Sequence, residues 1–582
     1  MQTIETDVVI IGGGGAGLRA AIAAAEADPD VSIALVSKVV PTRSHTVAAE
    51  GGAAGVIHPD DHLDRHFDDT VSGGDWLCEQ DVVEGFVARC TPEMTQMEQW
   101  GCPWSRRPDG GINVRYFGGM RSPRSWFAAD RTGFHMLHTL FQTSLKYPSI
   151  RRFDECFCTD LLVEDGRLRG VLAVHVASGD TLLFQCRAGV LATGGAGRVY
   201  RQNTNAGIVT GEGMGMALAC GTGLRDMEFV QWHPTTLPGS GLLITEGARG
   251  EGGILLNRHG RRYLQDHGLG PVDPWPRPRA MELGPRDRVS QAFWHEDRAG
   301  RTLSTPQGTA VHLDLRHLGR ATLEERLPQI LHLARTFAAV DPAEAPIPVR
   351  PAVHYTMGGV PTDRHGATAV EGLYAAGECA STGLHGANRL GSNSLAELLV
   401  FGRAAGEAAV AHARTARTPA PGVERQAGAA WRRWVSMLEP QGGERPAVLR
   451  DAMQAAMEEG VGIVREAEGM RRTCETLADL RARYRRGLRL DDTGRAFNTE
   501  WLTAIELGQA LKVAETIAHA ALAREESRGA HLRADGYDRR DDERFLCHSL
   551  AWDRGEEPPR IDHTPVTLTR SAPGERVYGG PA

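Results

Sequence analysis

The first forty residues alternate between short apolar runs and one glycine-rich turn. Residues 8–11 are apolar, residues 12–17 are five glycines and one alanine, residues 18–27 are rich in alanine, and residues 31–36 are mostly apolar again. A short apolar run is typical of a buried strand, and a longer alanine-rich stretch favours a helix. The pattern predicts a strand, a tight turn, a helix and a second strand, which is a βαβ unit.

Two later apolar runs also end in glycine turns. Residues 189–192 lead into Thr193, Gly194 and Gly195, and residues 372–376 lead into Gly377 and Glu378. Ligands of doubly wound α/β sheets bind beyond the carboxyl ends of the parallel strands. We therefore predict that the three turns converge on one nucleotide, and that the chain between the second and third turns is an insertion.

The insertion and the C-terminal third carry different patterns. Residues 231–353 include the proline-rich stretch 271–279, which predicts a surface connection, and we interpret the insertion as a separate lid. From about residue 426 a helical stripe appears, formed by Leu507, Leu511, Ala514, Ala518 and Ala521. After about residue 550 there is no clear period and there are several prolines, so an extended tail is expected.

Composition restricts the class of protein. The 582 residues exceed what one hydrophobic core usually supports, so several domains are expected. The formal net charge of −8 argues against a nucleic-acid partner but does not exclude a small anionic substrate. Neither a run of 18 apolar residues nor a basic leader occurs, so we expect a cytoplasmic chain that does not itself cross a membrane.

The ten cysteines are scattered along the chain. They show neither CxxC pairs nor the spaced runs that bind zinc or iron–sulfur clusters. We therefore expect no metal site in this chain, and any metal relay would belong to another chain.

The first glycine turn fits the pattern G-x-G-x-x-G through Gly12, Gly14 and Gly17. With this many glycines, chance alone gives about one such match per chain, so the pattern alone is weak. The strand before it and the helix after it strengthen the prediction that Gly12, Gly14, Gly15 and Gly17 bind a pyrophosphate. The second strand ends at Ser37 and Lys38 without an acidic residue for a ribose, which favours a flavin nucleotide over a nicotinamide cofactor.

Residues 43–52 read Arg-Ser-His-Thr-Val-Ala-Ala-Glu-Gly-Gly. This segment resembles the flavoprotein subunits of succinate dehydrogenase and fumarate reductase. In that family the histidine of Ser-His-Thr carries the 8α-methyl group of FAD, so the resemblance implies FAD attached covalently through His45. A lone histidine is more often an ordinary hydrogen-bonding residue, but the surrounding ten residues reverse that expectation.

The resemblance extends through nearly the whole chain. Similar motifs occur in family order at residues 73–76, 192–195, 233–235, 245–253, 284–287, 354–359, 377–379, 385–395, 526–531 and 540–542. Residues 73–80 and 576–580 look most similar to bacterial quinol:fumarate reductase. Two positions depart from the family: Glu212 replaces the usual Asp, and Ala248 stands where many members have a reactive Cys.

The fold implied by the resemblance is α/β, with an FAD-binding Rossmann-like domain, an inserted α+β capping domain, a helical C-terminal domain and an extended tail. We place the FAD-binding domain at residues 1–230 and 354–415 and the capping domain at 231–353. The helical domain is placed at 426–545 and the tail at 546–582. The further FAD contacts that the resemblance implies are Ser37, Lys38, Ser44, Thr46, Glu50, Gly51, Gly52, Thr193, Gly194, Glu212, Glu378, Arg389, Ser394 and Leu395.

A four-carbon dicarboxylate needs cationic or hydrogen-bonding groups at both ends, and the planar guanidinium of arginine suits a carboxylate. The family motifs assign Arg389 and His354 to one end, and His233 and Thr245 to the other. The resemblance further implies Arg286 as the proton donor. Glu246 and Arg249 would relay protons to it, because arginine by itself rarely deprotonates.

The implied enzyme interconverts fumarate and succinate, with hydride transfer from N5 of FAD. It would exchange electrons with quinone through an iron–sulfur subunit and membrane anchor subunits, at the cytoplasmic side of the inner membrane. The alternatives are succinate oxidation as the direction in the cell and an enzyme similar to L-aspartate oxidase, which lacks the histidine link. A non-catalytic electron carrier is a further alternative, but it would need no dicarboxylate site.

Overall fold

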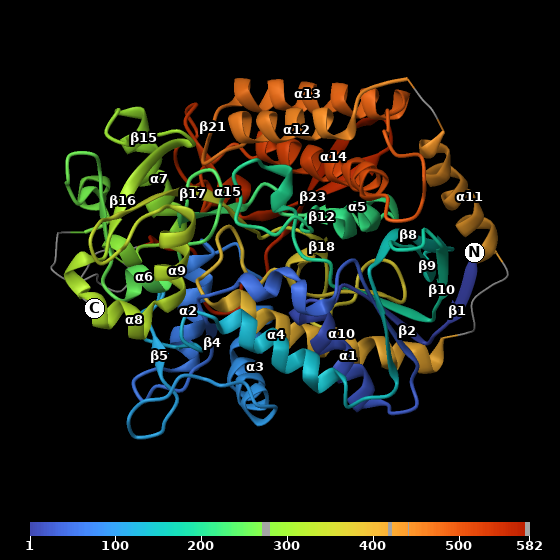
Figure 1. Cartoon of the computed structure of the whole chain (residues 1–582), viewed down its shortest axis with the longest axis horizontal. Coiled ribbons are helices and arrows are strands. Elements are labelled where there is room, and N and C mark those ends of the chain that lie inside the picture. Colours follow the sequence, from blue (N-terminus) through green and yellow to red (C-terminus); the bar gives the residue numbers. More distant parts are fainter. Residues whose placement is uncertain (271–279, 417–421, 440–441, 577–582) are drawn as a thin grey trace.

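A five-stranded parallel sheet forms the centre of the computed structural model, which describes residues 1–270, 280–416, 422–439 and 442–576 (Figure 1). Its order is β19 (Leu373–Ala375), β11 (Ala188–Leu191), β2 (Val8–Ile11), β3 (Ile33–Ser37) and β7 (Ile150–Asp154). Helix α1 (Gly15–Ala27) connects β2 to β3. The predicted βαβ unit is therefore confirmed.

The three glycine turns lie at one edge of this sheet. Strands β2, β11 and β19 are parallel and adjacent, and the amide of Ala192 donates to the carbonyl of Ile11 at 2.8 Å. Gly12 follows β2 directly, and Thr193 and Gly377 follow β11 and β19 after one intervening residue. The sheet order thus brings together turns that are far apart in sequence, as predicted.

Helices cover one face of the sheet, and a second sheet packs against the other. Helix α10 (Asn393–Thr415) packs closely on α1, because Gly402 and Gly406 face the backbone of Ala16 and Ala20, where a Cβ atom would overlap a carbonyl oxygen. The remaining helices of this part are α2 (Leu63–Gly73), α3 (Gln80–Gln99), α4 (Thr132–Ser144) and α5 (Glu212–Ala219). The second sheet contains β1 (Gln2–Glu5), β10 (Thr181–Gln185), β9 (Arg167–His175) and β8 (Cys156–Glu164).

The inserted segment, residues 231–353, has a hydrophobic core of its own, whose buried members all lie between Leu237 and Val349. This separate core supports treating the segment as a capping domain. The proline-rich stretch 271–279 lies outside the described residues. The strands are β13 (Val230–Thr236), β14 (Ile254–Leu256), β15 (Leu303–Thr305), β16 (Gly308–Asp314) and β17 (Ile347–Thr356). The helices are α6 (Glu246–Gly250), α7 (Arg286–Arg298), α8 (Arg320–Arg326) and α9 (Pro328–Phe337).

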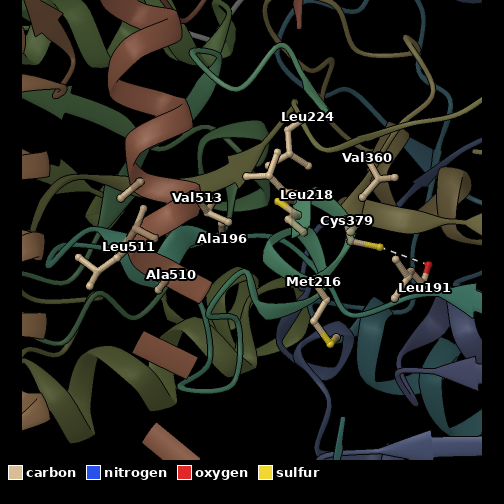
Figure 2. Packing of buried hydrophobic residues seen from close by; sticks show 14 of the residues in the cluster. Leu191, Ala196, Met216, Leu218, Leu224, Val360, Cys379, Ala510, Leu511 and Val513 are labelled. Atoms are coloured by element: carbon tan, nitrogen blue, oxygen red, sulfur yellow. Dashed lines mark hydrogen bonds between the residues drawn. The ribbon is translucent and has the colours of Figure 1, made fainter. Parts of the chain in front are cut away.

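The C-terminal third is helical, as its pattern predicts. Its helices are α11 (Val423–Val435), α12 (Pro446–Gly460), α13 (Ala467–Arg486), α14 (Thr499–Ala523) and the short α15 (Asp542–Phe545). Figure 2 shows Val513 of α14 next to Ala196, and one continuous core joins α14 to the parallel sheet. The apolar stripe of α14 is buried, so this helix fixes the helical part against the rest of the molecule.

The prediction of an extended tail over residues 546–582 is wrong for residues 547–565. Strands β23 (Cys547–Arg554) and β24 (Glu557–Pro565) form a hairpin that pairs with β12 (Leu224–Arg225). The pattern hid the hairpin because two buried positions of β23, His548 and Ser549, are polar. The prolines belong to β24, an edge strand, where the missing amide donors cost little. Residues 566–576 form neither helix nor strand, and residues 577–582 lie outside the described chain.

Candidate active site

A cavity of about 620 Å³ lies at the carboxyl edge of the parallel sheet, between that sheet and the inserted segment. Its walls include every predicted site residue except Gly17 and Arg249. The lining residues singled out from the sequence are Gly12, Gly14, Gly15, Ser37, Lys38, Ser44, His45, Thr46, Glu50, Gly51, Gly52, Thr193, Gly194, Glu212, His233, Thr245, Glu246, Arg286, His354, Glu378, Arg389, Ser394 and Leu395.

The glycine turn at the start of α1 leaves room for a phosphate group. Gly12 has a φ of +116°, and a Cβ on Gly17 would overlap the carbonyl oxygen of Gly12. Gly14 is the N-cap of α1 and offers no side-chain cap, and the first amide of the helix, that of Gly15, donates to Oγ1 of Thr46 at 3.1 Å. The positive end of the helix still faces the cavity, which favours an anion there. Gly17 thus shapes the turn without lining the cavity, and the turn fits a pyrophosphate.

His45 begins a short 3₁₀ turn, His45–Ala48, and points toward the loop that carries Asn205. The amide of Ala206 donates to Nδ1 at 3.3 Å, and Nε2 lies 3.1 Å from the side-chain nitrogen of Asn205. Burial, with a smaller contribution from Arg198, lowers the pKa of His45 to about 4. The imidazole is therefore uncharged at neutral pH.

Lys38 lies between two carboxylates at the far end of the cavity. Its Nζ is 2.6 Å from Oε1 of Glu212 and 2.6 Å from Oε1 of Glu506. Glu506 belongs to α14, so the helical part of the chain reaches the predicted nucleotide site. Sequence reasoning missed Glu506, because it lies 468 positions from Lys38 and no local pattern marks it.

Glu378 is buried at the turn after β19. The amide of Thr356 donates to its Oε1 at 3.0 Å, and Gly195 packs so closely that a side chain there would overlap the carboxyl group. Burial raises the pKa of Glu378 to about 7. This carboxyl group is thus able to donate or accept a hydrogen bond near neutral pH.

Two arginines from different parts of the chain meet at the opposite end of the cavity. Arg286, the first residue of α7, donates through Nε to Oε2 of Glu246 at 2.8 Å. Arg389 stacks on Tyr355, with its guanidinium carbon 4.3 Å from the ring centre. Burial and the neighbouring Arg286 lower the pKa of Arg389 to about 10, so it remains a cation at neutral pH.

Both guanidinium groups share one acceptor that sequence reasoning missed. Oε1 of Gln231 accepts from Arg286 at 3.0 Å and from Arg389 at 3.2 Å. Gln231 precedes the motif that begins at His233 by only two positions. Both residues lie on β13, and side chains two positions apart on a strand point to the same face. This spacing was the signal that could have identified Gln231.

Two histidines and a threonine complete this end of the cavity. The rings of His233 and His354 are 5.0 Å apart. Burial and the charge of Arg286 lower the pKa of both rings well below the usual value, so both are neutral. Thr245 caps α6 by accepting from the amide of Gly247 at 3.3 Å, which leaves its hydroxyl hydrogen free to donate.

A chain of charged groups leads from Arg286 into the inserted segment. Glu246 accepts from Arg286 and also lies 3.8 Å from a terminal nitrogen of Arg249. Burial raises the pKa of Glu246, but Arg286 and Arg249 outweigh it, and the net shift is downward. Arg249 is fully buried and donates to the carbonyl of Glu282. The three predicted residues thus lie in a row, with a hydrogen bond between Arg286 and Glu246 and a longer ion pair between Glu246 and Arg249.

Two further properties concern the part of the chain that the structure describes. There, no group of three or more His, Cys, Asp or Glu side chains is arranged to hold a metal ion. Within the same residues, no helix is long and apolar enough to cross a membrane.

The fold and the cavity define a flavoprotein: residues 7–395 match the family model described as FAD binding domain. Residues 450–578 match the model described as Fumarate reductase flavoprotein C-term. The chain belongs to the family of fumarate reductase and succinate dehydrogenase flavoprotein subunits, which are oxidoreductases acting on CH–CH groups.

Relatives match over the full length of the chain. The fumarate reductase flavoprotein subunit of Escherichia coli is 59% identical over 586 residues, which cover 100% of this chain and 97% of the relative. The succinate dehydrogenase flavoprotein subunit of Coxiella burnetii is 41% identical, and the match covers 97% of this chain and 96% of the relative. The solved structure of a single-site variant of FrdA from the E. coli quinol fumarate reductase has a TM-score of 0.98, with 59% identity and full coverage of both chains.

Proposed function

We propose that this chain is the catalytic flavoprotein subunit of a membrane-associated fumarate reductase, which reduces fumarate to succinate. The observation that carries the proposal is the pair of buried cationic arginines, Arg286 and Arg389, at the end of a cavity whose other end fits a nucleotide. Two relatives that are 59% identical over the full length of the chain are named fumarate reductase flavoprotein subunits. Another relative is named a succinate dehydrogenase flavoprotein subunit, so succinate oxidation is the alternative direction of the reaction.

The substrate would be held at both carboxylates. Arg389 and His354 would bind one of them, because a guanidinium and an imidazole both donate to a carboxylate oxygen. His233 and Thr245 would bind the other and twist it out of the plane of the double bond. Because both histidines are neutral, the positive charge that attracts the dianion comes from the arginines.

The FAD would supply a hydride from N5 to one carbon of the double bond. Arg286 would deliver a proton to the other carbon. Glu246 accepts from Arg286 at 2.8 Å and is ionised at rest, so it would first take up a proton and then pass it to the guanidine that Arg286 becomes after donating. Arg249 would in turn supply Glu246, but its terminal nitrogen lies 3.8 Å from the carboxylate without a hydrogen bond, so the two groups would have to approach for the transfer.

The FAD would be attached covalently to His45. Formation of a nitrogen–carbon bond requires an uncharged imidazole, and the lowered pKa of His45 supplies one. An imidazole alkylated at Nε2 keeps a lone pair on Nδ1, which matches the amide of Ala206 that points at Nδ1. The glycine turn would hold the pyrophosphate, and Glu212 and Glu378 would contact other parts of the cofactor.

Electrons would reach the flavin from quinol through an iron–sulfur subunit held at the membrane by anchor subunits. This chain would sit at the cytoplasmic side of the membrane and would touch it only through those partners. The inserted segment would act as a capping domain that closes over the substrate, since it carries Arg286 whereas Arg389 belongs to the sheet domain. Closure would assemble the site and exclude water.

The test is turnover by the flavin-loaded chain. Fumarate reduction by a reduced viologen dye and succinate oxidation by an acceptor dye would be measured on the same preparation. Faster fumarate reduction is the expected result. A preparation that holds FAD but converts neither acid would overturn the proposed function, and much faster succinate oxidation would favour the reverse direction.

A further inference from the structure

Gln231 occupies the point where the two active-site arginines meet. It lies on β13 and its side chain is fully buried. Its Oε1 accepts one hydrogen bond from Arg286 and one from Arg389. Arg286 begins α7 in the inserted segment, whereas Arg389 follows β20 (Ala380–Ser381) in the other segment, so this one oxygen joins the two parts of the chain.

The direction of the amide is fixed by groups that have only one role in a hydrogen bond. Nε2 of Gln231 lies 2.8 Å from the backbone carbonyl of Arg389, which only accepts, so the nitrogen must lie on that side. It also donates to Oδ1 of Asn388 at 2.9 Å. Asn388 is oriented in turn by its own donation to the carbonyl of Gly73 at 3.2 Å. The oxygen of Gln231 therefore faces the two guanidinium groups.

An uncharged hydrogen-bond acceptor between two cations can align them without neutralising their charge. A carboxylate there would form ion pairs with both arginines and cancel one of their two positive charges. The amide oxygen instead accepts two hydrogen bonds and carries no net charge. Both arginines are then aligned, and their charge stays available to an incoming dianion.

We propose that Gln231 is a positioning and specificity-determining residue, which aligns Arg286 with Arg389 through a neutral oxygen and keeps the site cationic for a dicarboxylate. The inference rests on the proposed function, because it assigns the two arginines to substrate binding and proton transfer. It also gives a role to Gly73, which belongs to the family motif at residues 73–76. The proposed reaction assigns no function to that motif. The chain Gly73, Asn388, Gln231 transmits the position of α2 to the arginine pair.

Two substitutions separate charge from alignment. Gln231→Glu keeps the size of the side chain and adds a negative charge, so the KM for fumarate and the Kd for the dianion malonate are expected to rise at least tenfold. Gln231→Met keeps the length but removes the acceptor, so kcat is expected to fall about tenfold with a smaller change in KM. Gln142→Glu, on the exposed face of α4, adds the same charge elsewhere and is expected to leave both constants unchanged.

The experiment uses the flavin-loaded full chain, with malonate binding followed by the flavin absorbance. An unmutated chain that fails to reduce fumarate would refute the proposed function before any variant is compared. If the unmutated chain is active, unchanged constants in Gln231→Glu would overturn the role of Gln231 alone, as would equal changes of kcat and KM in both variants. If one variant loses FAD, the other decides the matter by the same criterion.

Discussion

Arg286 is held from two sides before any substrate arrives. Nε donates to the ionised Glu246 and a terminal nitrogen donates to Gln231, so the guanidinium has little freedom to turn. A group that transfers a proton must already lie in the correct position, because misplacement costs rate directly. The arrangement would keep the guanidinium in position if Arg286 delivers the proton, as proposed.

Replacement of Arg286 by glutamine tests its role as the acid. Gln keeps a polar group next to Glu246 but has no proton to give, so kcat for fumarate is expected to fall by about 10²- to 10⁴-fold. FAD content should be retained, whereas malonate binding should weaken, since only Arg389 remains of the two cations that hold the dianion. Arg288→Gln, exposed on the same helix, serves as the control. Residual turnover above a few per cent would mean that another group donates the proton.

Replacement of His45 by serine tests the covalent bond. FAD should still bind, because the glycine turn and Glu378 are unchanged, but acid precipitation should leave the flavin in the supernatant. A flavin without the imidazole substituent is richer in electrons, and a fall of about 60 mV in its potential costs about 2.8 kcal/mol for two electrons. Succinate oxidation should therefore suffer more than fumarate reduction. Flavin that stays in the protein pellet would place the bond on another residue.

The family motifs in the sequence predict His45, Arg286 and Arg389, and the structure brings all three to one cavity. Gln231 and Glu506 were not predicted. A glutamine on a strand and a glutamate on a helix carry no local signal, because their partners lie far away along the chain. Contacts of this kind depend on how the segments pack, which periodicity alone does not determine.

At the scale of elements, the hairpin β23–β24 shows how buried ionic contacts can hide a strand. Nδ1 of His548 lies 2.6 Å from Asp226 and Nε2 lies 3.1 Å from Glu79. The buried positions of β2 and of the stripe on α14 are apolar, and both elements were predicted correctly. The strand β23 instead buries a histidine, and a pattern analysis assigns histidine to the surface.

The contacts of His548 predict a pH-dependent stability. Burial lowers the pKa of His548, but Asp226 and Glu79 outweigh it, and the net shift is upward. The contribution to stability is therefore complete below the unfolded pKa of about 6.5 and is lost as the pH rises through the folded pKa. His548→Gln is expected to lower the melting temperature most near pH 6, with a difference that shrinks toward pH 9.

The control for this prediction is His563→Gln, at an exposed position of β24. It should change the melting temperature little at any pH. The measurement is thermal unfolding of both variants and the unmutated chain between pH 6 and pH 9. A difference for His548→Gln that grew with pH would contradict the assignment of the charged state.

At the scale of the whole molecule, the last described residue connects three parts of the chain. Arg576 donates to both oxygens of Asp287, at 2.8 and 3.2 Å, and lies 3.6 Å from Asp75. Asp287 directly follows Arg286 in α7, and Asp75 also pairs with Arg540 at 2.8 Å. The end of the chain thus holds the start of α7 against the sheet domain and the helical part.

Replacement of Arg576 by glutamine should disturb Arg286 through Asp287. Loss of one partner of a buried ion pair leaves the other charge uncompensated, so kcat is expected to fall about tenfold while FAD stays bound. Arg576→Lys should restore part of the activity. Arg570→Gln removes an exposed pair with Asp64 from the same stretch and should have little effect. If Arg576→Gln and Arg570→Gln lowered kcat equally, the effect would come from weaker packing of residues 566–576 as a whole and not from the contact with Asp287.

The contact between Asp287 and Arg576 also bears on how the protein is made. These residues are 289 positions apart, so at about 5 to 20 residues per second the ribosome needs about 15 to 60 s to pass from one to the other. During that interval the nascent chain already contains the glycine turn, His45 and Arg286, but nothing yet holds α7 from the C-terminal side. The start of α7 is therefore made well before Arg576, the residue that pairs with it, and lacks that ion pair for the whole interval.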